Sequence, residues 1–172
     1  TMTNSSFESL LESFDASLLR ADVGEKNVTK LMSDSDAILG GEPSGHIIYS
    51  EKLPTSDAVL ASILLLEVLF KKKESLHELK KILKKKPQIL RSFSVFKKVE
   101  LNKLLKVSKK IEEYKELLNG EGRLVFRYSG TENKARLMLE GLSEGELSKM
   151  ADDFVALAVG EIESFVKKNG KI

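Results

Sequence analysis

Two arginines bracket a short polar segment, Arg127-Tyr-Ser-Gly-Thr-Glu-Asn-Lys-Ala-Arg136, which carries the groups that bind phosphate in proteins. Each guanidinium can hold two phosphate oxygens through its planar fork. Ser129 and Thr131 add hydroxyl donors, and Gly130 is free to adopt a positive φ that lets backbone amides converge on an anion. The segment therefore predicts a phosphate site. The alternative is a structural turn whose arginines pair with surface carboxylates.

A second polar segment, Gly40-Gly-Glu-Pro-Ser-Gly-His46, has the groups to bind sugar hydroxyls. The Glu42 carboxylate can accept hydrogen bonds from two adjacent hydroxyl groups, and Ser44 adds a hydroxyl of its own. Glycines on both sides let the backbone come close to a sugar ring. Two interpretations of His46 stay open. It is either a structural residue at the start of an apolar strand or a substrate contact that helps to move protons.

The elements that must position the two arginines form an α+β pattern over the second half of the chain. Apolar periodicity and turn residues predict strands over 89–96, 123–127 and 134–140, a helix over 100–118 closed by Asn119-Gly120, and a last helix opened by a capping box of Ser143 and Glu146. The arginine segment then forms the tip of a β-hairpin. The order β-α-β-β-α predicts a small antiparallel sheet covered by two helices.

The first half of the chain has an α/β pattern. It predicts helices over 7–19 and 27–32, strands over 37–39 and 46–49, and a helix over 58–70. Ser5 and Glu8 have capping-box spacing for the first helix. The loop 40–45 joins the two strands. The helix over 58–70 is almost wholly apolar and is expected to be buried, with Asp57 among its N-cap candidates.

Composition favours a soluble cytoplasmic protein. Apolar residues make up 41% and charged residues 31% of the chain, and the absence of cysteine excludes disulfides and thiolate metal sites. The start of the chain lacks the apolar run of a signal peptide, and 58–70 is too short to cross a bilayer. Asp34 and Asp36 form the only Asp-x-Asp pair, for which a solvated turn is favoured over a magnesium site.

Basic residues concentrate in the middle of the chain. Residues 71–120 carry 16 basic and 6 acidic side chains, a balance that raises the possibility of nucleic-acid binding. The lysines alternate with apolar residues at helical spacing, so a solvated lysine face is favoured, and no nucleic-acid or membrane partner is expected. Pro87 ends the basic run. It divides the chain into a predicted domain over 1–86, incomplete at its N-terminus, and a predicted domain over 87–172.

The two polar segments resemble motifs of the α-D-phosphohexomutases. The pattern Arg-x-Ser-Gly-Thr-Glu-x-x-x-Arg is similar to the phosphate-binding loop of that family's last domain, and 40–46 is similar to the sugar-binding loop of its third domain. Within the family, Gly40-Gly41-Glu42 and the run 23–28 most resemble bacterial phosphoglucosamine mutases. Glu25, Lys26 and Asn27 depart from that subfamily's Asp, Arg and Tyr.

The resemblance implies a partial third α/β domain followed by a TATA-binding-protein-like domain with a small antiparallel sheet and two helices. It assigns Glu42, Ser44 and His46 to the sugar and assigns Arg127, Ser129, Gly130, Thr131 and Arg136 to phosphate. It implies no catalytic residue in this chain, apart from a proton-transfer role for His46. The phosphoserine loop and the aspartate triplet that binds magnesium are expected in the N-terminal domains of the same protein.

The implied function is the C-terminal, substrate-binding part of a mutase that interconverts glucosamine 6-phosphate and glucosamine 1-phosphate through an enzyme phosphoserine, in UDP-N-acetylglucosamine biosynthesis. The fragment alone is expected to bind a hexosamine phosphate without catalysis. Two alternatives remain, a phosphomannomutase/phosphoglucomutase of the same superfamily and a non-catalytic binding module.

Overall fold

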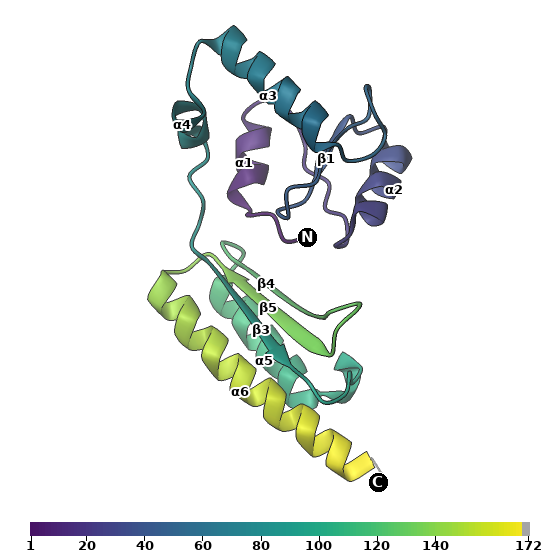
Figure 1. Ribbon diagram of the computed structural model, residues 1–172. Coiled ribbons are helices and arrows are strands. Elements are labelled where there is room, and N and C mark those ends of the chain that lie inside the picture. The colour runs from purple at the N-terminus through teal and green to yellow at the C-terminus, as the bar shows by residue number, and fades with distance from the viewer. Residues whose placement is uncertain (170–172) are drawn as a thin grey trace. The chain divides into compact units, whose positions relative to one another are not determined.

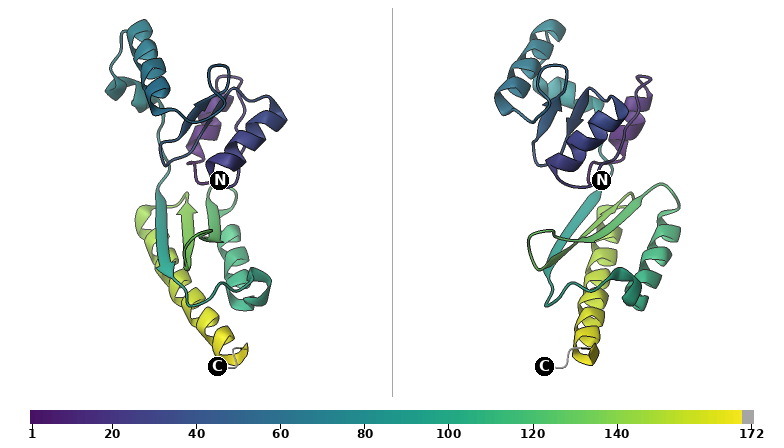
Figure 2. Two further views of the ribbon diagram at one scale, coloured as in Figure 1. Left: turned by 45° about the vertical axis from the view of Figure 1, so that its right-hand side comes forward. Right: turned by 90° about the vertical axis from the view of Figure 1, so that its right-hand side faces the viewer.

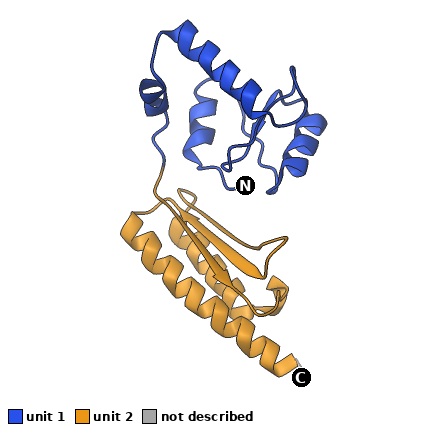
Figure 3. Ribbon diagram, viewed as in Figure 1, with its two compact units in different colours: residues 1–85 blue, residues 86–172 orange. Residues whose placement is uncertain are grey.

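The chain divides into two units, Thr1–Lys85 and Lys86–Ile172, of which the computed structural model describes residues 1–169 (Figure 3). The first unit contains α1 (Ser6–Glu12), α2 (Glu25–Ser35), β1 (Leu39–Gly41), β2 (Ile47–Tyr49), α3 (Ala58–Lys72), α4 (Leu76–Leu79) and the 3-10 turn η1 (Lys80–Ile82) (Figure 1). The second contains β3 (Gln88–Ser94), the 3-10 turn η2 (Leu101–Lys103), α5 (Leu105–Leu118), β4 (Arg123–Tyr128), β5 (Lys134–Glu140) and α6 (Glu144–Asn169).

The second unit is an antiparallel sheet of three strands in the order β3-β5-β4, with α5 and α6 packed on one face (Figure 2). Aromatic side chains join the two layers. Phe126 of β4 meets Phe154 of α6 edge to face, with 5.0 Å between ring centroids. Leu137 of β5 and Val107 of α5 are fully buried in the same core. The predicted β-α-β-β-α arrangement is confirmed.

Strand alternation separates this core from the arginines. Phe126 and Leu137 lie opposite each other across the hairpin and point towards the helices. Arg127 follows Phe126 on β4, and Arg136 precedes Leu137 on β5. The two arginines also lie directly opposite each other. Because successive side chains of a strand point to opposite faces, both arginines project from the face away from the helices.

The predicted helix over 100–118 is wrong at its start. Residues 101–103 form the turn η2, Leu104 leaves helical geometry at φ −102° and ψ 79°, and α5 begins only at Leu105. The N-terminus of α5 is capped from another element. Glu161 of α6 accepts hydrogen bonds from the amides of Lys106 (2.9 Å) and Val107 (2.8 Å). A carboxylate remote in sequence thus determines where α5 begins.

Two predicted helix ends in the second unit, one at an Asn-Gly pair and one at a serine, are confirmed. Asn119 ends α5 in the left-handed region at φ 43°. The amide of Glu146 donates to the Ser143 hydroxyl at 3.4 Å, and the Ser143 amide donates back to the Glu146 carboxylate at 3.2 Å. These reciprocal bonds form the capping box of α6.

The first β-hairpin is displaced from its predicted position. β1 covers 39–41 rather than 37–39, and Gly40 and Gly41 pair with Ile48 and Ile47 as strand residues. The connecting loop is therefore 42–46 and not 40–45. The cause is close packing of α2 on β1, since a Cβ at Gly40 would lie 2.2 Å from the Met32 sulfur. Only glycine lets the helix approach this strand.

The helix α1 is shorter than its predicted range of 7–19. Asp15 takes a left-handed φ of 55°, and the amides of Ala16 and Asp15 close the helix onto the carbonyls of Leu11 (3.0 Å) and Glu12 (3.1 Å). The predicted capping box of Ser5 and Glu8 does not form, because the Glu8 carboxylate binds Arg20 at 2.9 Å and Ser5 makes no side-chain cap bond. The helix α2 is longer than its predicted range of 27–32.

The helix α3 begins where predicted, and the Asp57 carboxylate caps it by accepting from the Leu60 amide at 2.7 Å. Its predicted burial is wrong. Val59, Leu66 and Phe70 are 71%, 63% and 85% exposed. The two-stranded hairpin β1–β2 is too small a partner to cover a helix that is apolar on all sides. Among the helices of residues 1–169, none combines the length and apolar character that crossing a bilayer requires.

Candidate functional site

The tip of the hairpin β4–β5 places two cationic side chains on one carboxylate. The Glu132 carboxylate accepts from Lys134 at 2.6 Å and from Arg136 at 3.2 Å. These partners, Lys134 above all and then Arg136, hold the pKa of Glu132 below its ordinary value of 4.5. Arg136 remains 41% exposed, with Arg127 opposite it in the pairing register. Glu132 therefore orients Arg136 without covering it.

The backbone of the tip is closed by Ser129. Its amide donates to the Lys134 carbonyl at 2.8 Å, and its hydroxyl accepts from the Glu132 amide at 3.3 Å. Ser129 is only 4% exposed, whereas Gly130 and Thr131 are exposed. Ser129 thus holds the tip in shape, and the next two residues face solvent.

The expected positive φ at Gly130 is wrong. Among residues 1–169, the glycines in the left-handed region are Gly24, Gly45, Gly120 and Gly141. The tip runs from 129 to 133 between the two strands, and a loop of this length turns without the special dihedral angles that a two-residue turn demands.

Lys98 also contacts the tip, from the segment that follows β3, and no sequence pattern indicated this. Its ammonium donates to the carbonyl oxygens of Ser129 (2.6 Å) and Gly130 (3.4 Å). Lys98 lies four residues after the end of β3, which pairs with β5. Just beyond β3, the Val95 amide donates to the Asn133 carbonyl at 2.9 Å, and this bond keeps the segment close to the tip. Lys98 is one of many lysines in residues 71–120, and nothing in the composition of this segment distinguishes Lys98 from the others.

The loop between β1 and β2 gathers Glu42, Ser44 and His46. The Glu42 amide donates to the His46 carbonyl at 2.9 Å, and Gly45 turns the chain at φ 101°. The Ser44 hydroxyl lies 2.9 Å from Nδ1 of His46, and a Glu42 oxygen lies 3.8 Å from the same nitrogen. The loop therefore presents a carboxylate, a hydroxyl and an imidazole side by side.

Glu42 is held more firmly than its neighbours on this loop. Its second oxygen accepts from the Gly24 amide at 2.9 Å, and its side chain is 13% exposed against 50% for His46. Gly24 precedes α2 at φ 120°, a conformation suited to glycine. The bond to Gly24 aligns the carboxylate, whose other oxygen is the one that lies 3.8 Å from Nδ1 of His46.

The structure thus brings the predicted site residues together in two groups. Glu42, Ser44 and His46 share a loop of the first unit. Arg127, Ser129, Gly130, Thr131 and Arg136 share the hairpin tip of the second unit, together with Lys98 and Lys134. Within residues 1–169 no group of three His, Cys, Asp or Glu side chains is placed to hold a metal ion.

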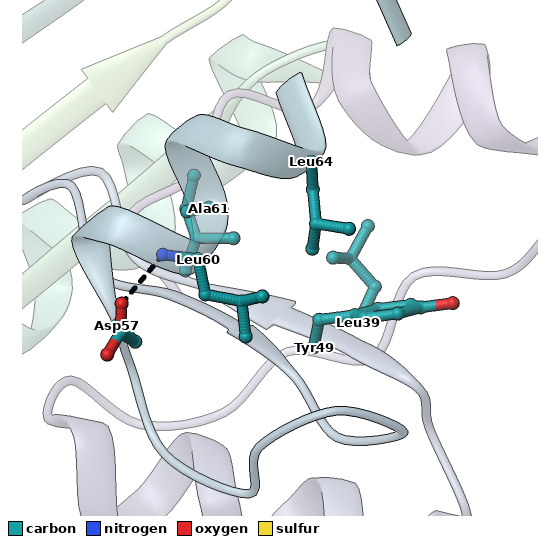
Figure 4. A pocket seen from close by; sticks show the side chains of 7 residues that line it. Leu39, Tyr49, Asp57, Leu60, Ala61 and Leu64 are labelled. Carbon is teal, nitrogen blue, oxygen red and sulfur yellow. Dashed lines mark hydrogen bonds between the residues drawn. The ribbon is translucent and has the colours of Figure 1, made fainter. Parts of the chain in front are cut away.

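A pocket between the first hairpin and α3 has a different character (Figure 4). Its walls are mainly apolar and include Leu39, Leu60 and Leu64. Its one carboxylate, Asp57, is engaged in capping α3. The lining of this pocket offers no cation for a phosphate.

Two family models match the chain. Residues 1–86 match "Phosphoglucomutase/phosphomannomutase, alpha/beta/alpha domain III", and residues 65–157 match "Phosphoglucomutase/phosphomannomutase, C-terminal domain". Together these matches include both polar loops.

Curated relatives named phosphoglucosamine mutase align along most of the chain. The chain is 33% identical to that of Desulfotalea psychrophila over 91% of its length, 35% to that of Chlamydia trachomatis serovar D over 94%, and 40% to that of Koribacter versatilis over 88%. The matches cover 35%, 35% and 33% of these relatives, so the chain spans about a third of their length.

Solved structures show the same fold at low identity. The N-acetylphosphoglucosamine mutase of Aspergillus fumigatus, as a serine-to-alanine variant in complex with glucose 1,6-bisphosphate, matches with a TM-score of 0.72 and 18% identity over 93% of this chain and 37% of that chain. An N-acetylglucosamine-phosphate mutase in a substrate complex, described as a member of the alpha-D-phosphohexomutase superfamily, matches with a TM-score of 0.70 and 16% identity over 91% of this chain and 37% of that chain.

Proposed function

Because the chain belongs to the phosphoglucomutase/phosphomannomutase family of α-D-phosphohexomutases, we propose that it is the substrate-binding, C-terminal part of a phosphoglucosamine mutase. The whole protein interconverts glucosamine 6-phosphate and glucosamine 1-phosphate. The three named relatives, at 33–40% identity, support this activity over that of a phosphomannomutase or phosphoglucomutase.

The observation that carries the proposal is the hairpin tip, where Arg127 and Arg136 lie opposite each other on one face. Two guanidinium forks and the exposed amides of Gly130 and Thr131 form a cradle for a dianion. In a mutase, an enzyme phosphoserine gives its phosphoryl group to the free end of the sugar phosphate. The bisphosphate then turns around and returns its other phosphoryl group to the serine. The cradle suits both orientations because it binds a phosphate regardless of the carbon that carries it.

The loop of Glu42, Ser44 and His46 recognises the sugar in this proposal. The Glu42 carboxylate, aligned by the Gly24 amide, accepts from ring hydroxyls, and Ser44 adds a polar contact. His46, 2.9 Å from the Ser44 hydroxyl, contacts the substrate and is suited to proton movement. The remaining catalytic parts, a phosphoserine and a bound magnesium ion, belong to the other domains of a cytoplasmic enzyme.

Binding of glucosamine 6-phosphate to the 172-residue chain tests the phosphate site. In calorimetric titrations, Arg127→Ala and Arg136→Ala should each weaken binding by roughly 1.5–3 kcal/mol, the range for hydrogen bonds to charged groups. Arg91→Ala is the matched control. Arg91 stands on β3 of the same sheet but binds Asp152 and Ser148, each at 2.9 Å, on α6.

Circular dichroism should show that both tip variants remain folded. Equal affinity of the Arg127→Ala, Arg136→Ala and Arg91→Ala variants would show that the tip does not bind the phosphate. Loss of folding in the two tip variants would assign these arginines a structural role instead.

A further inference from the structure

Lys98 contacts the phosphate hairpin at two consecutive peptide groups. Its ammonium donates to the Ser129 carbonyl at 2.6 Å and to the Gly130 carbonyl at 3.4 Å. The segment that carries Lys98 is anchored on both sides. The Val95 amide donates to the Asn133 carbonyl at 2.9 Å, and the Val99 amide donates to the Tyr128 hydroxyl at 3.4 Å. Val95 and Val99 are 7% and 5% exposed, so the ends of the segment are fixed in the core.

Peptide geometry connects these two contacts to the anion-binding side of the loop. In a trans peptide the carbonyl of one residue and the amide of the next point in opposite directions, and no described peptide bond is cis. Lys98 holds the carbonyls of Ser129 and Gly130 on its own side. The amides of Gly130 and Thr131 are therefore directed away from Lys98.

The residues that carry these amides lie at the solvent-exposed end of the loop. Gly130 and Thr131 are exposed, and a Cβ built on Gly130 would meet no atom within 4 Å. In residues 1–169, neither amide donates a hydrogen bond to another group. Two parallel amides at an exposed loop tip, with their carbonyls bound to a cation on the far side, form a preorganised donor pair for an anion.

We propose that Lys98 is a positioning residue of the phosphate site. It orients the amides of Gly130 and Thr131 by binding the opposite ends of their peptide groups, and its charge adds to the positive field of the tip. The ammonium acts through the backbone and makes no bond to the phosphate. This inference deepens the proposed function and rests on it.

The test compares the unsubstituted 172-residue chain with three variants, Lys98→Met, Lys98→Arg and Lys97→Met. Methionine has a similar length to lysine but no charge or N–H donor, and arginine keeps both. Lys97, the exposed neighbour, controls for the loss of one positive charge. Each 15N-labelled chain is titrated with inorganic phosphate and with glucosamine 6-phosphate, and the amide signals of Gly130 and Thr131 are followed by NMR.

Lys98→Met should weaken binding of both ligands about ten-fold, the lower end of what a charged hydrogen bond contributes. Without ligand it should also move the amide signals of Gly130 and Thr131, because their peptide planes are released. Lys98→Arg should restore most of the affinity. Lys97→Met should leave the two amide signals in place. Thermal unfolding should change little in any variant, since Lys98 is exposed.

Equal affinities and equal Gly130 and Thr131 signals in Lys98→Met and Lys97→Met would overturn the role of Lys98 while the phosphate site stands. If neither ligand moves these two signals in the unsubstituted chain, both the inference and the proposed function are wrong. Should Lys98→Met fail to fold, Lys98→Leu carries the same comparison, because leucine also lacks a charge and an N–H donor. Its affinity should then lie below that of the arginine variant, and affinity equal to that of the unsubstituted chain would overturn the role.

Discussion

Gly130 occupies a position at which the chain itself does not require glycine. Its φ is outside the left-handed region, and an added Cβ would meet nothing within 4 Å. Gly122, in contrast, lies where a Cβ would come within 2.2 Å of the Glu140 carbonyl. Neither the backbone conformation nor the packing at position 130 requires glycine, and a ligand that comes close to the backbone would require it.

Replacing Gly130 with alanine should therefore lower the affinity for the ligand without lowering the stability of the fold. The free energy of unfolding should stay constant or rise by about 0.4–1 kcal/mol, because the unfolded chain loses freedom. Affinity for glucosamine 6-phosphate should fall because the methyl group obstructs the approach of phosphate. Urea denaturation and calorimetry measure the two quantities. Gly122→Ala, as the control, should lower stability, and unchanged phosphate affinity in Gly130→Ala would contradict the proposed cradle.

Glu132 makes the tip sensitive to acid. Lys134 first, and then Arg136, lower the pKa of Glu132 in the folded chain. A carboxyl group with a lowered pKa stabilises the fold above its unfolded value, here 4.5, and that contribution is lost as the pH falls through the lowered pKa. The Glu132 carboxyl carbon should thus titrate by NMR with a midpoint below 4.5. Lys134→Met should raise the midpoint more than Arg136→Met, and the reverse order would contradict the assignment of the main partner.

At the scale of elements, the second unit depends on a cap that joins its two helices. Glu161 of α6 accepts from two amides at the start of α5. Glu161→Ala leaves these donors without their acceptor and should lower the free energy of unfolding by about 1–3 kcal/mol, whereas Glu161→Gln keeps one acceptor and should cost less. Glu163→Ala, at an exposed position on the same helix, is the control. Equal stability of the two alanine variants would show that this cap contributes nothing.

The other helix and strand boundaries fall into two groups, those set by interactions between residues close in the sequence and those set by contacts between distant segments. The starts of α3 and α6 and the end of α5 agree with the sequence because Asp57, Ser143 and Asn119 act on amides or carbonyls within a few residues. The start of α5 and the position of β1 do not agree. They depend on Glu161 and on the packing of Met32 against Gly40, and no local pattern encodes either contact.

For the whole molecule, the proposed function predicts a ranking of substrates. The complete protein should turn over glucosamine phosphates with a higher kcat/KM than glucose or mannose phosphates, as measured by steady-state kinetics on the three sugars. Higher or comparable values for mannose or glucose phosphate would assign the protein to the phosphomannomutase/phosphoglucomutase branch. Salt-dependent retention on DNA, without any binding of sugar phosphate, would instead favour an interaction module acting through the lysines of 71–120.

Local sequence was enough to place both polar segments on β-hairpins and to give the order of the elements in the second unit, because spacing over a few residues decides which groups share a turn or a helix face. Packing in three dimensions decided which of many lysines contacts the β4–β5 hairpin, how the Gly24 amide aligns Glu42, and that most of α3 is exposed. The pairing of β3 with β5 brings Lys98 to peptide groups more than thirty residues away along the chain. Such contacts depend on how strands and helices pack against each other, and the spacing of nearby residues in the sequence does not determine that packing.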